Sequence, residues 1–487
     1  MSLPGRAAAW QTARAQNGVP AVAEHPRIHR ILSPADGTEV AARALAGPAE
    51  IEQALERAAA AQKAWRRVGL AERMAICERF VAHFTANGAA IAAEISAQMG
   101  RPVGQTPGEI RGVAERARMM ISLAAESLAP VRPAPVAGFE RFITREPLGV
   151  VFVIGAWNYP YLITVNSVVP ALLAGNAVVL KQASQTLLCA ERFAESFAAA
   201  GLPEHVFQVL HLANADAEAV IRDPRVDFIA FTGSVATGHR VVRAAADRFA
   251  GIGLELGGKD PAYVRRDADI VHAADNLVDG AFFNSGQSCC GIERIYVDAA
   301  VYDDFIARFV ETTNAYRLGH SLDPATTLGP MVNAAGADFV RGQIAEALAA
   351  GATALIDEAR FPESRPGTPY LAPQVLVNVD HRMDVMRSES FGPVVGIMKV
   401  ASDAEAIGLM NDSPYGLTAS VWTRDVEAAT RIGGEIETGT VFMNRCDYLD
   451  PALAWVGVKD SGRGCTLSRI GFEHLTRPKS FHLKAAP

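Results

Sequence analysis

Cysteine is scarce in this sequence, and its few cysteines are not spaced for bridging or for metal binding. Six cysteines are present among 487 residues, and none forms a CxxC pair. A disulfide framework and a zinc site are therefore not expected, and we predict no bound metal. Reduced thiols favour a cytoplasmic location. One stretch differs from the rest, because NSGQSCCGIER (284–294) places Cys289 beside Cys290 between glycines.

Long apolar runs and an excess of positive charge are also missing. The longest apolar run, LGVVFVIGAW at 148–157, contains two glycines. It falls short of the ~18 residues that a membrane span requires. A net charge of -7 does not supply the basic face that nucleic acid requires. We therefore expect a protein that binds neither membrane nor nucleic acid.

The chain is long and rich in hydrophobic residues, and its predicted elements follow one another in a clear order. With 487 residues, 49% of them hydrophobic, two or three packed units are expected. Apolar residues at three- and four-residue spacing predict helices over 49–68 and 71–88, and a further helix is predicted over 108–128. A proline-rich joint then leads into 139–151, whose alternation predicts extended strand.

From Gly149 onward, short strands alternate with helices. Runs rich in Val, Ile and Phe occur at 150–156, 177–181, 206–210 and 226–233. This rhythm predicts a parallel sheet with helices on both faces, which binds ligands beyond the carboxyl ends of its strands. A second unit of the same kind begins after Pro261. A helix over 267–287 is predicted to lead into the two cysteines, with a strand at 293–298.

Two motifs at predicted strand ends suit a phosphate-bearing ligand. FTGSVATG (231–238) follows a strand and opens a helix, so its glycines and free N–H groups favour an anion. It is not the GxGxxG fingerprint, and a tight turn would explain it equally well. Lys181 ends another strand and so lies at the ligand-binding edge, where a solvated lysine is also common.

Three further motifs carry polar groups suited to catalysis or ligand binding. Glu255 in LELGGKD has glycines nearby that leave a general base free to move, although a surface turn fits as well. Asn158 in GAWNYPY can donate to a developing oxyanion or cap the turn before Pro160. Glu389 and Phe391 in SESFGPV suit a hydroxyl-bearing ligand, or else a loop carboxylate and a core ring.

In this order, the motifs resemble the aldehyde dehydrogenase superfamily. The resemblance extends from about residue 30 almost to the C-terminus and rests on WNYP, VVLK, FTGS, ELGGK, GQSCC, ESFGPV, NDSPYGL and GVKDSGRG. Eight elements in register are specific, and together they outweigh the structural explanation of each one. The resemblance implies an NAD(P)-dependent, non-acylating enzyme that oxidises an aldehyde to a carboxylic acid and forms a homodimer or homotetramer.

The resemblance also implies roles for the catalytic residues. Cys289, two residues after the glutamine of GQxC, would be the nucleophile and Cys290 a bystander. Asn158 and the backbone N–H of Cys289 would stabilise the oxyanion of the thiohemiacetal, a contribution of typically ~3 kcal/mol per donor. After hydride transfer to the nicotinamide, water activated by Glu255 would hydrolyse the thioester.

A cofactor cleft for NAD or NADP follows from the same resemblance. Lys181 would bind the adenosine ribose, Gly233 and Ser234 would lie beside the pyrophosphate, and Glu389 would bind the nicotinamide ribose. The residues implied for this cleft are Ile154, Gly155, Ala156, Trp157, Lys181, Ser184, Phe231, Gly233, Ser234, Thr237, Leu256, Gly257, Glu389 and Phe391. Those chosen for the substrate mouth are Tyr159, Asn166, Ser288, Leu449 and Trp455.

Three departures from the family pattern bear on specificity. KPxE reads KQAS at 181–184, so Ser184 replaces a glutamate that would repel a 2′-phosphate. We therefore expect NADP to be accepted at least as readily as by typical NAD-preferring members. The glycine-rich turn before the FTGS strand reads LANADAE (212–218), and PFGG reads AWVG (454–457), which brings Trp455 near the aldehyde tunnel.

Two other functions stay open at this point. In a CoA-acylating semialdehyde dehydrogenase, CoA would take the acyl group, but such relatives commonly lack the glutamate base. A catalytically silent member would act only in binding or structure, but Cys289, Glu255 and Asn158 are all present. Arg445 is a candidate for recognising a substrate carboxylate, with a structural salt bridge as its alternative.

The family resemblance implies an α/β fold with two Rossmann-type parallel-sheet domains and a small β oligomerisation element. We expect an NAD(P)-binding domain in residues 1–130 and 149–257 and a catalytic domain in 258–447. The oligomerisation element is expected from 131–148 together with 472–487. Such a protruding β element leaves an open edge that a second subunit would cover.

Overall fold

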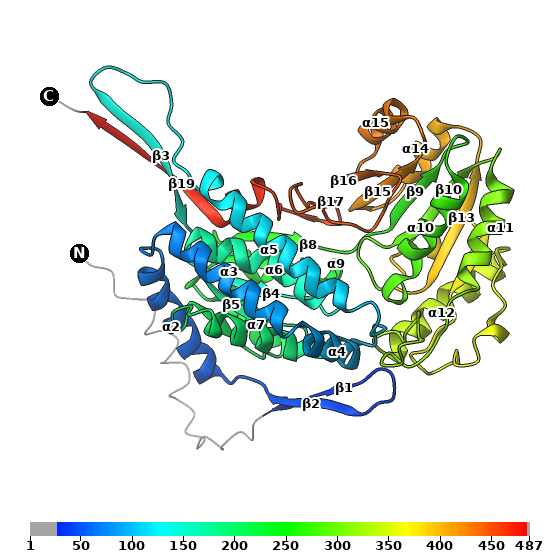
Figure 1. Cartoon of the computed structure of the whole chain (residues 1–487), viewed down its shortest axis with the longest axis horizontal. Coiled ribbons are helices and arrows are strands. Elements are labelled where there is room, and N and C mark those ends of the chain that lie inside the picture. The colour runs from blue at the N-terminus through cyan, green and yellow to red at the C-terminus, as the bar shows by residue number, and fades with distance from the viewer. Residues whose placement is uncertain (1–26, 485–487) are drawn as a thin grey trace.

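The computed structural model describes residues 27–484, which form two lobes, each built on a sheet (Figure 1). The first lobe holds a six-stranded sheet and the second lobe a seven-stranded sheet. A separate two-stranded ribbon projects from the first lobe, away from the second (Figure 1). The predicted α/β class, with two parallel-sheet units and a small β element, is confirmed.

The sheet of the first lobe has the strand order β18-β8-β7-β4-β5-β6. All its pairs are parallel except β18 with β8. Strands β4 and β5 are buried along their whole length, which accounts for their unbroken apolar sequences. The strands are β4 (Val150–Ile154), β5 (Ala177–Lys181), β6 (Phe207–Val209), β7 (Val226–Thr232), β8 (Gly251–Glu255) and β18 (Gly462–Arg463).

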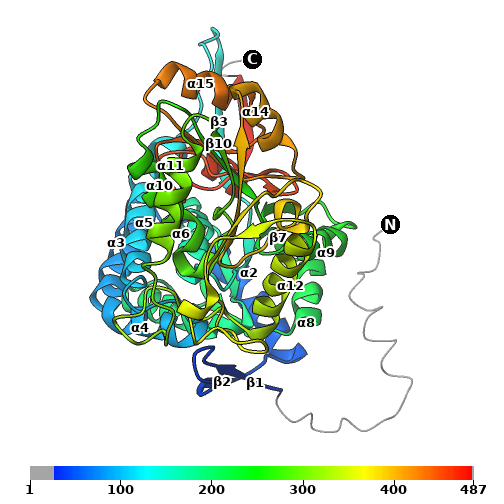
Figure 2. The ribbon, with the colours of Figure 1, turned by 90° about the vertical axis from the view of Figure 1, so that its right-hand side faces the viewer.

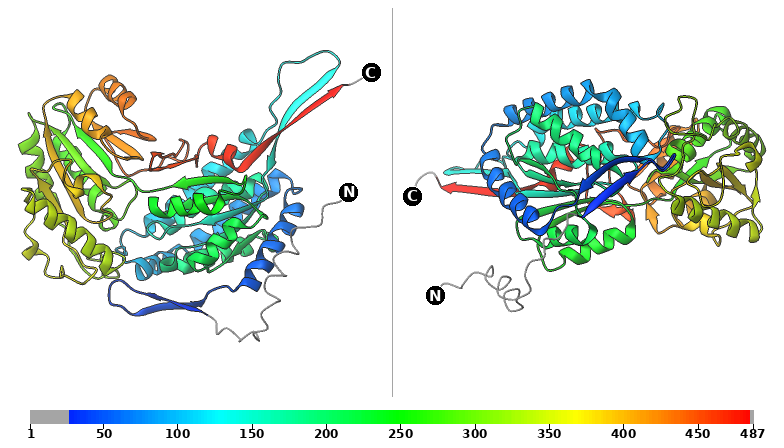
Figure 3. Two further views of the ribbon diagram at one scale, coloured as in Figure 1. Left: turned by 180° about the vertical axis from the view of Figure 1, so that it is seen from behind. Right: turned by 90° about the horizontal axis from the view of Figure 1, so that it is seen from below.

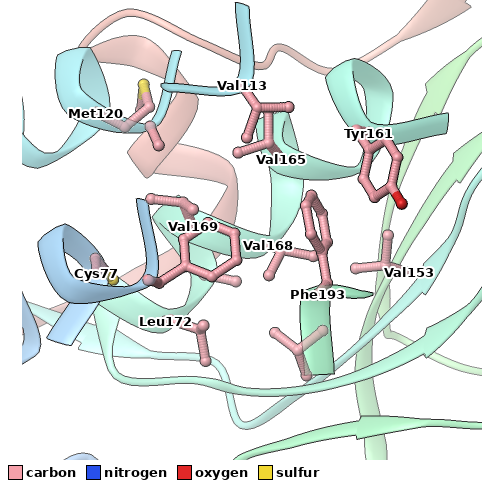
Figure 4. Close-up of a cluster of buried hydrophobic side chains, with 14 of the residues drawn as sticks. Cys77, Val113, Met120, Val153, Tyr161, Val165, Val168, Val169, Leu172 and Phe193 are labelled. Atoms are coloured by element: carbon pink, nitrogen blue, oxygen red, sulfur yellow. The ribbon is translucent and has the colours of Figure 1, made fainter. Parts of the chain in front are cut away.

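Helices cover both faces of this sheet (Figure 3). On one face α3, α5, α6 and α7 enclose the largest apolar cluster, in which the Phe193 ring packs between Tyr161 and Phe80 (Figure 4). On the other face lie α2, α8 and α9. The helices of this lobe are α2 (Pro48–Trp65), α3 (Leu70–Ala86), α4 (Gly88–Met99), α5 (Pro107–Ser127), α6 (Pro160–Ala174), α7 (Leu187–Ala199), α8 (Asn214–Arg222) and α9 (Val235–Ala245), with η1 (Ser184–Thr186).

Helix α4 is an element that the sequence pattern did not reveal. Its sequence, GAAIAAEISAQM, has few polar positions to mark a solvent face, so helical periodicity is weak. Before these helices, β1 (Ile28–Leu32) and β2 (Glu39–Ala44) form an antiparallel pair along the base of the molecule (Figure 1). Their turn reaches the second lobe, where Tyr370 donates a 2.8 Å hydrogen bond to the Ala35 carbonyl.

The second lobe has the strand order β11-β12-β13-β10-β9-β15-β16, and only β11 pairs in an antiparallel sense. Helices α14 and α15 pack on one face and α10 and α11 on the other (Figure 2). The strands are β9 (Asp260–Val264), β10 (Ile292–Asp298), β11 (Thr353–Ala354), β12 (Gln374–Val377), β13 (Val394–Val400), β15 (Thr418–Trp422) and β16 (Thr440–Met443). The helices are α10 (Ile270–Phe282), α11 (Tyr302–Thr313), α12 (Ala334–Ala349), α13 (Asp384–Arg387), α14 (Asp403–Asn411) and α15 (Val426–Glu435), with η2 (Phe283–Gly286) and η3 (Glu358–Arg360).

The helix predicted over 267–287 is wrong beyond Phe282. Asn284 and Ser285 take left-handed backbone angles, with φ of 53° and 57°, and Gly286 follows at 71°. Three successive residues with positive φ cannot continue a right-handed helix. The turn is held from outside, because Ser285 Oγ donates to the Gly329 carbonyl at 2.8 Å and Gln105 Oε1 accepts from the Asn284 N–H.

The projecting ribbon pairs two segments that lie far apart in the sequence. Strand β3 (Phe139–Pro147) is antiparallel to β19 (Thr476–Lys484), and the rings of Phe142 and Phe481 stack with centroids 4.6 Å apart. The segments at 131–148 and 472–487 thus meet, although residues 1–26 and 485–487 lie outside the described part. The short helix η4 (Ile470–Leu475) leads into β19, whereas β14 (Tyr415–Gly416) and β17 (Val458–Lys459) form a separate antiparallel pair. No helix within residues 27–484 is both long and apolar enough to cross a membrane.

Candidate active site

Cys289 lies where two cavities meet. The cofactor-side cavity, of about 500 Å³, opens beyond the carboxyl ends of β4, β5 and β7. The substrate-side cavity, of about 310 Å³, lies between α5, α6 and the loop after β16. Cys289 lines both, and its side chain is only partly buried. A thiol in this position can contact one ligand from each side.

Every residue that the family resemblance implied for a cofactor cleft lines the cofactor-side cavity. These residues are Ile154, Gly155, Ala156, Trp157, Lys181, Ser184, Phe231, Gly233, Ser234, Thr237, Leu256, Gly257, Glu389 and Phe391. They meet because parallel strands end at one edge of the sheet. The LANADAE stretch also contributes, since Asn214, Ala217 and Glu218 from α8 line the same cavity. Sequence reasoning did not include these three residues, nor Arg240 from α9.

At the cofactor-side cavity, the strand ends place the ammonium group of Lys181 and the N-terminus of α9 in the same cavity wall. Lys181 is buried at the end of β5, and burial lowers the pKa of its ammonium group. Ser234 caps α9, with Oγ accepting from the Thr237 N–H at 3.4 Å. A side chain at Gly233 would meet the Phe231 ring at 2.7 Å, so a glycine is needed there. This edge suits a phosphate-bearing ligand.

Glu389 enters the cofactor-side cavity from the second lobe. Its Oε1 accepts a 3.0 Å hydrogen bond from the Gly258 N–H, and burial raises its pKa to about 8. A side chain at Gly257 would lie 2.4 Å from the Glu389 carboxylate, so the ELGG glycines allow this close approach. A carboxylate beside a cavity suits the hydroxyl groups of a ribose.

The loop that carries Glu389 is clamped by Glu293, which sequence reasoning missed. Glu293 is buried and accepts from the N–H groups of Ser390 at 2.8 Å and Phe391 at 2.9 Å. Its charge is balanced by the buried Lys259. Glu293 is the first residue of the strand predicted at 293–298, and nothing in that sequence pattern predicts its hydrogen bonds to the Glu389 loop.

The loop before Cys289 is tied to Asn158 in the first lobe. Asn158 is 3% exposed at the end of β4, and its Nδ2 donates to the Gln287 carbonyl at 3.2 Å. Asn284 Nδ2 donates to the same carbonyl at 3.1 Å. The amide of Asn158 therefore lies next to the turn that carries the thiol.

Arg101 connects the residues of this junction, and no sequence pattern predicts this role. Its guanidinium donates to the carbonyl of Asn158, to Asn284 Oδ1 at 3.1 Å, and to Glu109 Oε2 at 2.6 Å. Glu109 in turn accepts from the Tyr161 N–H at 2.8 Å. Arg101 and Glu109 are both almost fully buried, so their charges neutralise each other without solvent.

The two adjacent cysteines have different surroundings. Cys290 is buried, and its thiol donates to Asp447 Oδ1 at 2.9 Å. Its hydrogen bond with Cys289, together with burial, raises the pKa of Cys290 well above the usual value. Ser288 Oγ donates to the same Asp447 oxygen at 3.2 Å. Cys290 therefore stays a protonated thiol, whereas Cys289 faces the cavities.

Glu255 lies in the substrate-side cavity with Cys289 and is not a solvated surface residue. Thr466 Oγ1 donates to Glu255 Oε1 at 2.5 Å, and Thr232 Oγ1 lies 3.4 Å from Oε2. Burial raises the pKa of the Glu255 carboxyl, with the two hydroxyls and Arg116 opposing that shift. The surface-turn interpretation of Glu255 is therefore wrong.

The five residues chosen for the substrate mouth all line the substrate-side cavity: Tyr159, Asn166, Ser288, Leu449 and Trp455. Arg445 does not. Its guanidinium stacks on the Tyr448 ring at 3.7 Å from the centroid, and within residues 27–484 it forms neither a salt bridge nor a cavity wall. Neither role suggested for Arg445 is borne out.

An α/β fold with a thiol between two cavities, beside a carboxyl and an amide, suits an enzyme whose thiol acts as a nucleophile. A family model described as "Aldehyde dehydrogenase family" matches residues 22–481. The chain therefore belongs to the aldehyde dehydrogenase family and is an oxidoreductase that acts on aldehydes. The recognition drawn from the eight motifs is confirmed.

Individual relatives agree with this assignment. Betaine aldehyde dehydrogenase of Cereibacter sphaeroides is 35% identical over 464 residues, which is 94% of each chain. A putative succinate-semialdehyde dehydrogenase [NADP(+)] of Mycolicibacterium smegmatis is 36% identical over 85% of this chain and 81% of its own. The NAD-dependent aldehyde dehydrogenase structure from Sinorhizobium meliloti superposes with a TM-score of 0.91 at 31% identity, covering 95% and 92% of the two chains.

Proposed function

We propose that this enzyme oxidises an aldehyde to a free carboxylic acid through a thioester on Cys289, with NAD or NADP as the hydride acceptor. The observation that carries the proposal is the position of Cys289, which lines both cavities. Asn158 lines one of them and Glu255 the other. Cofactor and aldehyde can therefore reach the same thiol from opposite sides.

The chain's residues suit a dinucleotide in the cofactor-side cavity. Lys181 would hold the adenosine ribose, Gly233 and Ser234 would lie beside the pyrophosphate, and Glu389 would accept from the nicotinamide ribose. The bound nicotinamide accepts the hydride. We accordingly assign residues 1–130 and 149–257 to cofactor binding and 258–447 to catalysis.

Two N–H donors would stabilise the oxyanion: the side-chain amide of Asn158 and the backbone N–H of Cys289, which follows the turn at 284–286. The thiolate of Cys289 attacks the aldehyde carbon, and the carbonyl oxygen becomes negative. The amide of Asn158 and the backbone N–H of Cys289 donate to that oxygen. Because both are held by buried contacts, they need no reorganisation during the reaction.

Glu255 prepares water for hydrolysis of the thioester. Burial raises its pKa, which makes its carboxylate a stronger base than a solvated glutamate. The thioester carbon is attacked by the water oxygen, Glu255 takes the proton, and the Cys289 thiolate leaves. This step distinguishes a free-acid product from acyl transfer to CoA.

An assay with and without CoA tests the proposal. We expect turnover without CoA and a free acid as the product. We also expect Glu255→Gln to release about one equivalent of reduced cofactor per subunit and then stall, because acylation precedes the lost step. Strict dependence of turnover on CoA would favour the acylating alternative, and full activity of Cys289→Ala would support neither form of thioester chemistry.

We also infer that the β3–β19 ribbon mediates a homodimer or homotetramer. Within the described residues, β19 pairs only with β3, which leaves its other edge unpaired, and the outer edge of β3 is covered only by a bridge between Ile143 and Val131 and one between Phe139 and Val136. A second copy of the chain would pair with or cover these edges. Light scattering of the full chain and of a variant with Leu483→Glu would test this, since a charge on the ribbon should shift the mass toward the monomer.

A further inference from the structure

The substrate-side cavity contains a buried guanidinium that no carboxylate pairs with among the described residues. Arg116, on α5, is 9% exposed and lines the cavity with Cys289 and Glu255. Of the other arginines nearby, Arg101 pairs with Glu109 at 2.6 Å and Arg118 with Glu78 at 3.5 Å. Arg111 also lines the cavity without an ion pair among the described residues, but it is exposed and therefore solvated. A buried cation without an ion-pair partner is costly, and its retention requires an explanation.

Only one nitrogen of Arg116 donates a hydrogen bond to another residue within the described range 27–484. Nη1 donates to the Leu162 carbonyl at 2.9 Å and to Asn166 Oδ1 at 3.2 Å. A guanidinium carries five N–H groups. Those on Nε and Nη2 of Arg116 have no hydrogen-bond acceptor among residues 27–484. Because a guanidinium can only donate, the oxygen of Asn166 must face it, which leaves the Asn166 amide nitrogen as a further donor.

Arg116 and Asn166 therefore present several donors and no acceptor to the substrate-side cavity. Asn166 is 2% exposed and lines that cavity as well. A ligand group that satisfies such a pair must have several acceptor oxygens and a negative charge. A carboxylate meets both requirements, and a planar guanidinium matches its geometry.

None of the remaining ionisable groups of the cavity forms an ion pair with Arg116 among the described residues. Glu115 and Arg111 are exposed and carry opposite charges, and Glu115 accepts from the Tyr448 hydroxyl at 3.0 Å. Glu109 is occupied by Arg101. Asp447 already accepts from Ser288 and Cys290, and burial raises its pKa to about 7. Burial also raises the pKa of Glu255. Burial also lowers the pKa of Arg116, with the charge of Glu255 opposing that shift, but a guanidinium stays protonated in proteins. The raised pKa values of Asp447 and Glu255 leave less negative charge beside Arg116, which favours an anion in the cavity.

We propose that Arg116, together with Asn166, binds a carboxylate carried by the aldehyde substrate. The physiological substrate is then an aldehyde acid and not a neutral or cationic aldehyde. This inference rests on the proposed function, because it supplies the substrate class of that same reaction. Arg116 acts as a specificity-determining residue, and it positions the aldehyde carbon at Cys289 by anchoring the other end of the molecule.

Two aldehydes of equal chain length test the proposal: 4-oxobutanoate, which carries a carboxylate, and butanal, which does not. We expect wild type to prefer 4-oxobutanoate by ~10-fold or more in kcat/KM. Arg116→Gln should lose ~30-fold or more on 4-oxobutanoate, chiefly through KM, and less than ~3-fold on butanal. Arg118→Gln is the matched control on the same helix, outside the cavity, and should leave both aldehydes unchanged.

A second variant and a second readout guard against misfolding. Arg116→Lys keeps the positive charge but lacks the two parallel N–H donors of a guanidinium. Its kcat/KM on 4-oxobutanoate should therefore fall between those of wild type and Arg116→Gln. Succinate, the product of 4-oxobutanoate oxidation, should inhibit butanal oxidation competitively in wild type and ~10-fold more weakly in either Arg116 variant. If Arg116→Gln melts earlier than Arg118→Gln, the Lys variant and the inhibition constants decide the matter.

The outcomes separate the two levels of the proposal. Equal losses on both aldehydes in the Arg116 variants would assign the arginine to the chemistry at Cys289 and Glu255 and would overturn carboxylate recognition. The same conclusion follows if wild type shows no preference for 4-oxobutanoate, or prefers an aldehyde bearing a trimethylammonium group. If no aldehyde of any charge is oxidised, the proposed function and this inference fail together.

Discussion

The side-chain amide of Asn158 donates a 3.2 Å hydrogen bond to the carbonyl of Gln287, two residues before Cys289. This bond joins a strand end of the first lobe to the cysteine loop of the second lobe. It uses one of the two amide N–H groups, and the other has no acceptor among the described residues. The proposed oxyanion donor Asn158 and the loop that carries the proposed nucleophile Cys289 are thus joined in the protein without a ligand.

Asn158→Ala should slow catalysis strongly while leaving cofactor binding nearly intact. One oxyanion donor contributes ~3 kcal/mol, so kcat should fall by about 100-fold or more. The KM for the cofactor should change little, because the main contacts of that cavity come from the strand ends. Steady-state kinetics with a fast aldehyde will check this, and a loss confined to KM would contradict the role of Asn158.

Arg101→Met should destabilise the protein as well as slow it. The substitution leaves Glu109 buried without its partner, which costs about 3–5 kcal/mol in the free energy of unfolding. The same change at Arg118, which forms an exposed pair, should cost less than about 1 kcal/mol. Urea unfolding will measure both variants.

Arg101→Lys separates positioning from stability, since it keeps the charge but cannot reach three acceptors at once. We expect its kcat to fall with little change in KM. An unchanged kcat would mean that Asn158 needs no support from Arg101.

Alkylation should distinguish the adjacent cysteines. Cys290 is buried, and its pKa is raised, so it has little thiolate to react. Cys289 lines two cavities and should be modified first by iodoacetamide, with loss of activity in parallel. Peptide mapping over time gives the order, and saturating aldehyde should protect Cys289. Earlier labelling of Cys290 would refute the assignment.

Cofactor binding should depend on the ionisation of Glu389. Its pKa is raised to about 8, so the carboxylate that accepts from ribose hydroxyls dominates only above that pH. As pH falls below 8, cofactor binding must first deprotonate Glu389, and the KM for cofactor should rise by up to ~10-fold per pH unit. Glu389→Gln should bind more weakly, with a flat profile between pH 6 and about 8. An equally steep profile in that variant would locate the titration elsewhere.

Ser184 should permit NADP. It lines the cofactor-side cavity with Arg240, so a hydroxyl and a cation are available where a glutamate would repel a 2′-phosphate. We expect the ratio of kcat/KM for NAD over NADP to stay below ~100. Ser184→Glu should raise that ratio by ~10-fold or more, chiefly through the KM for NADP. A ratio above ~100 in wild type would refute this prediction.

Much of the site could be predicted because it rests on local motifs at strand ends. Lys181 and Glu255 are the last residues of their strands and Gly233 follows one, and the carboxyl ends of parallel strands lie at one edge of the sheet. The failures concern side-chain contacts that the sequence pattern does not reveal, both local and between distant segments. Arg445 stacks on Tyr448, and the helix leading to Cys289 ends early because Asn284 is held by Arg101 from another lobe.

By itself, the sequence determined the α/β class, the family, and which cysteine, glutamate and asparagine stand at the candidate site, since motif order and strand periodicity are properties of short segments. Only the tertiary structure decided what surrounds them. Arg101 and Arg116 lie in stretches without any motif, and Glu293 lies just after the GQSCC motif, so the importance of all three comes from burial and from partners far along the chain. A buried charge has meaning only through its neighbours, and folding alone brings those neighbours together.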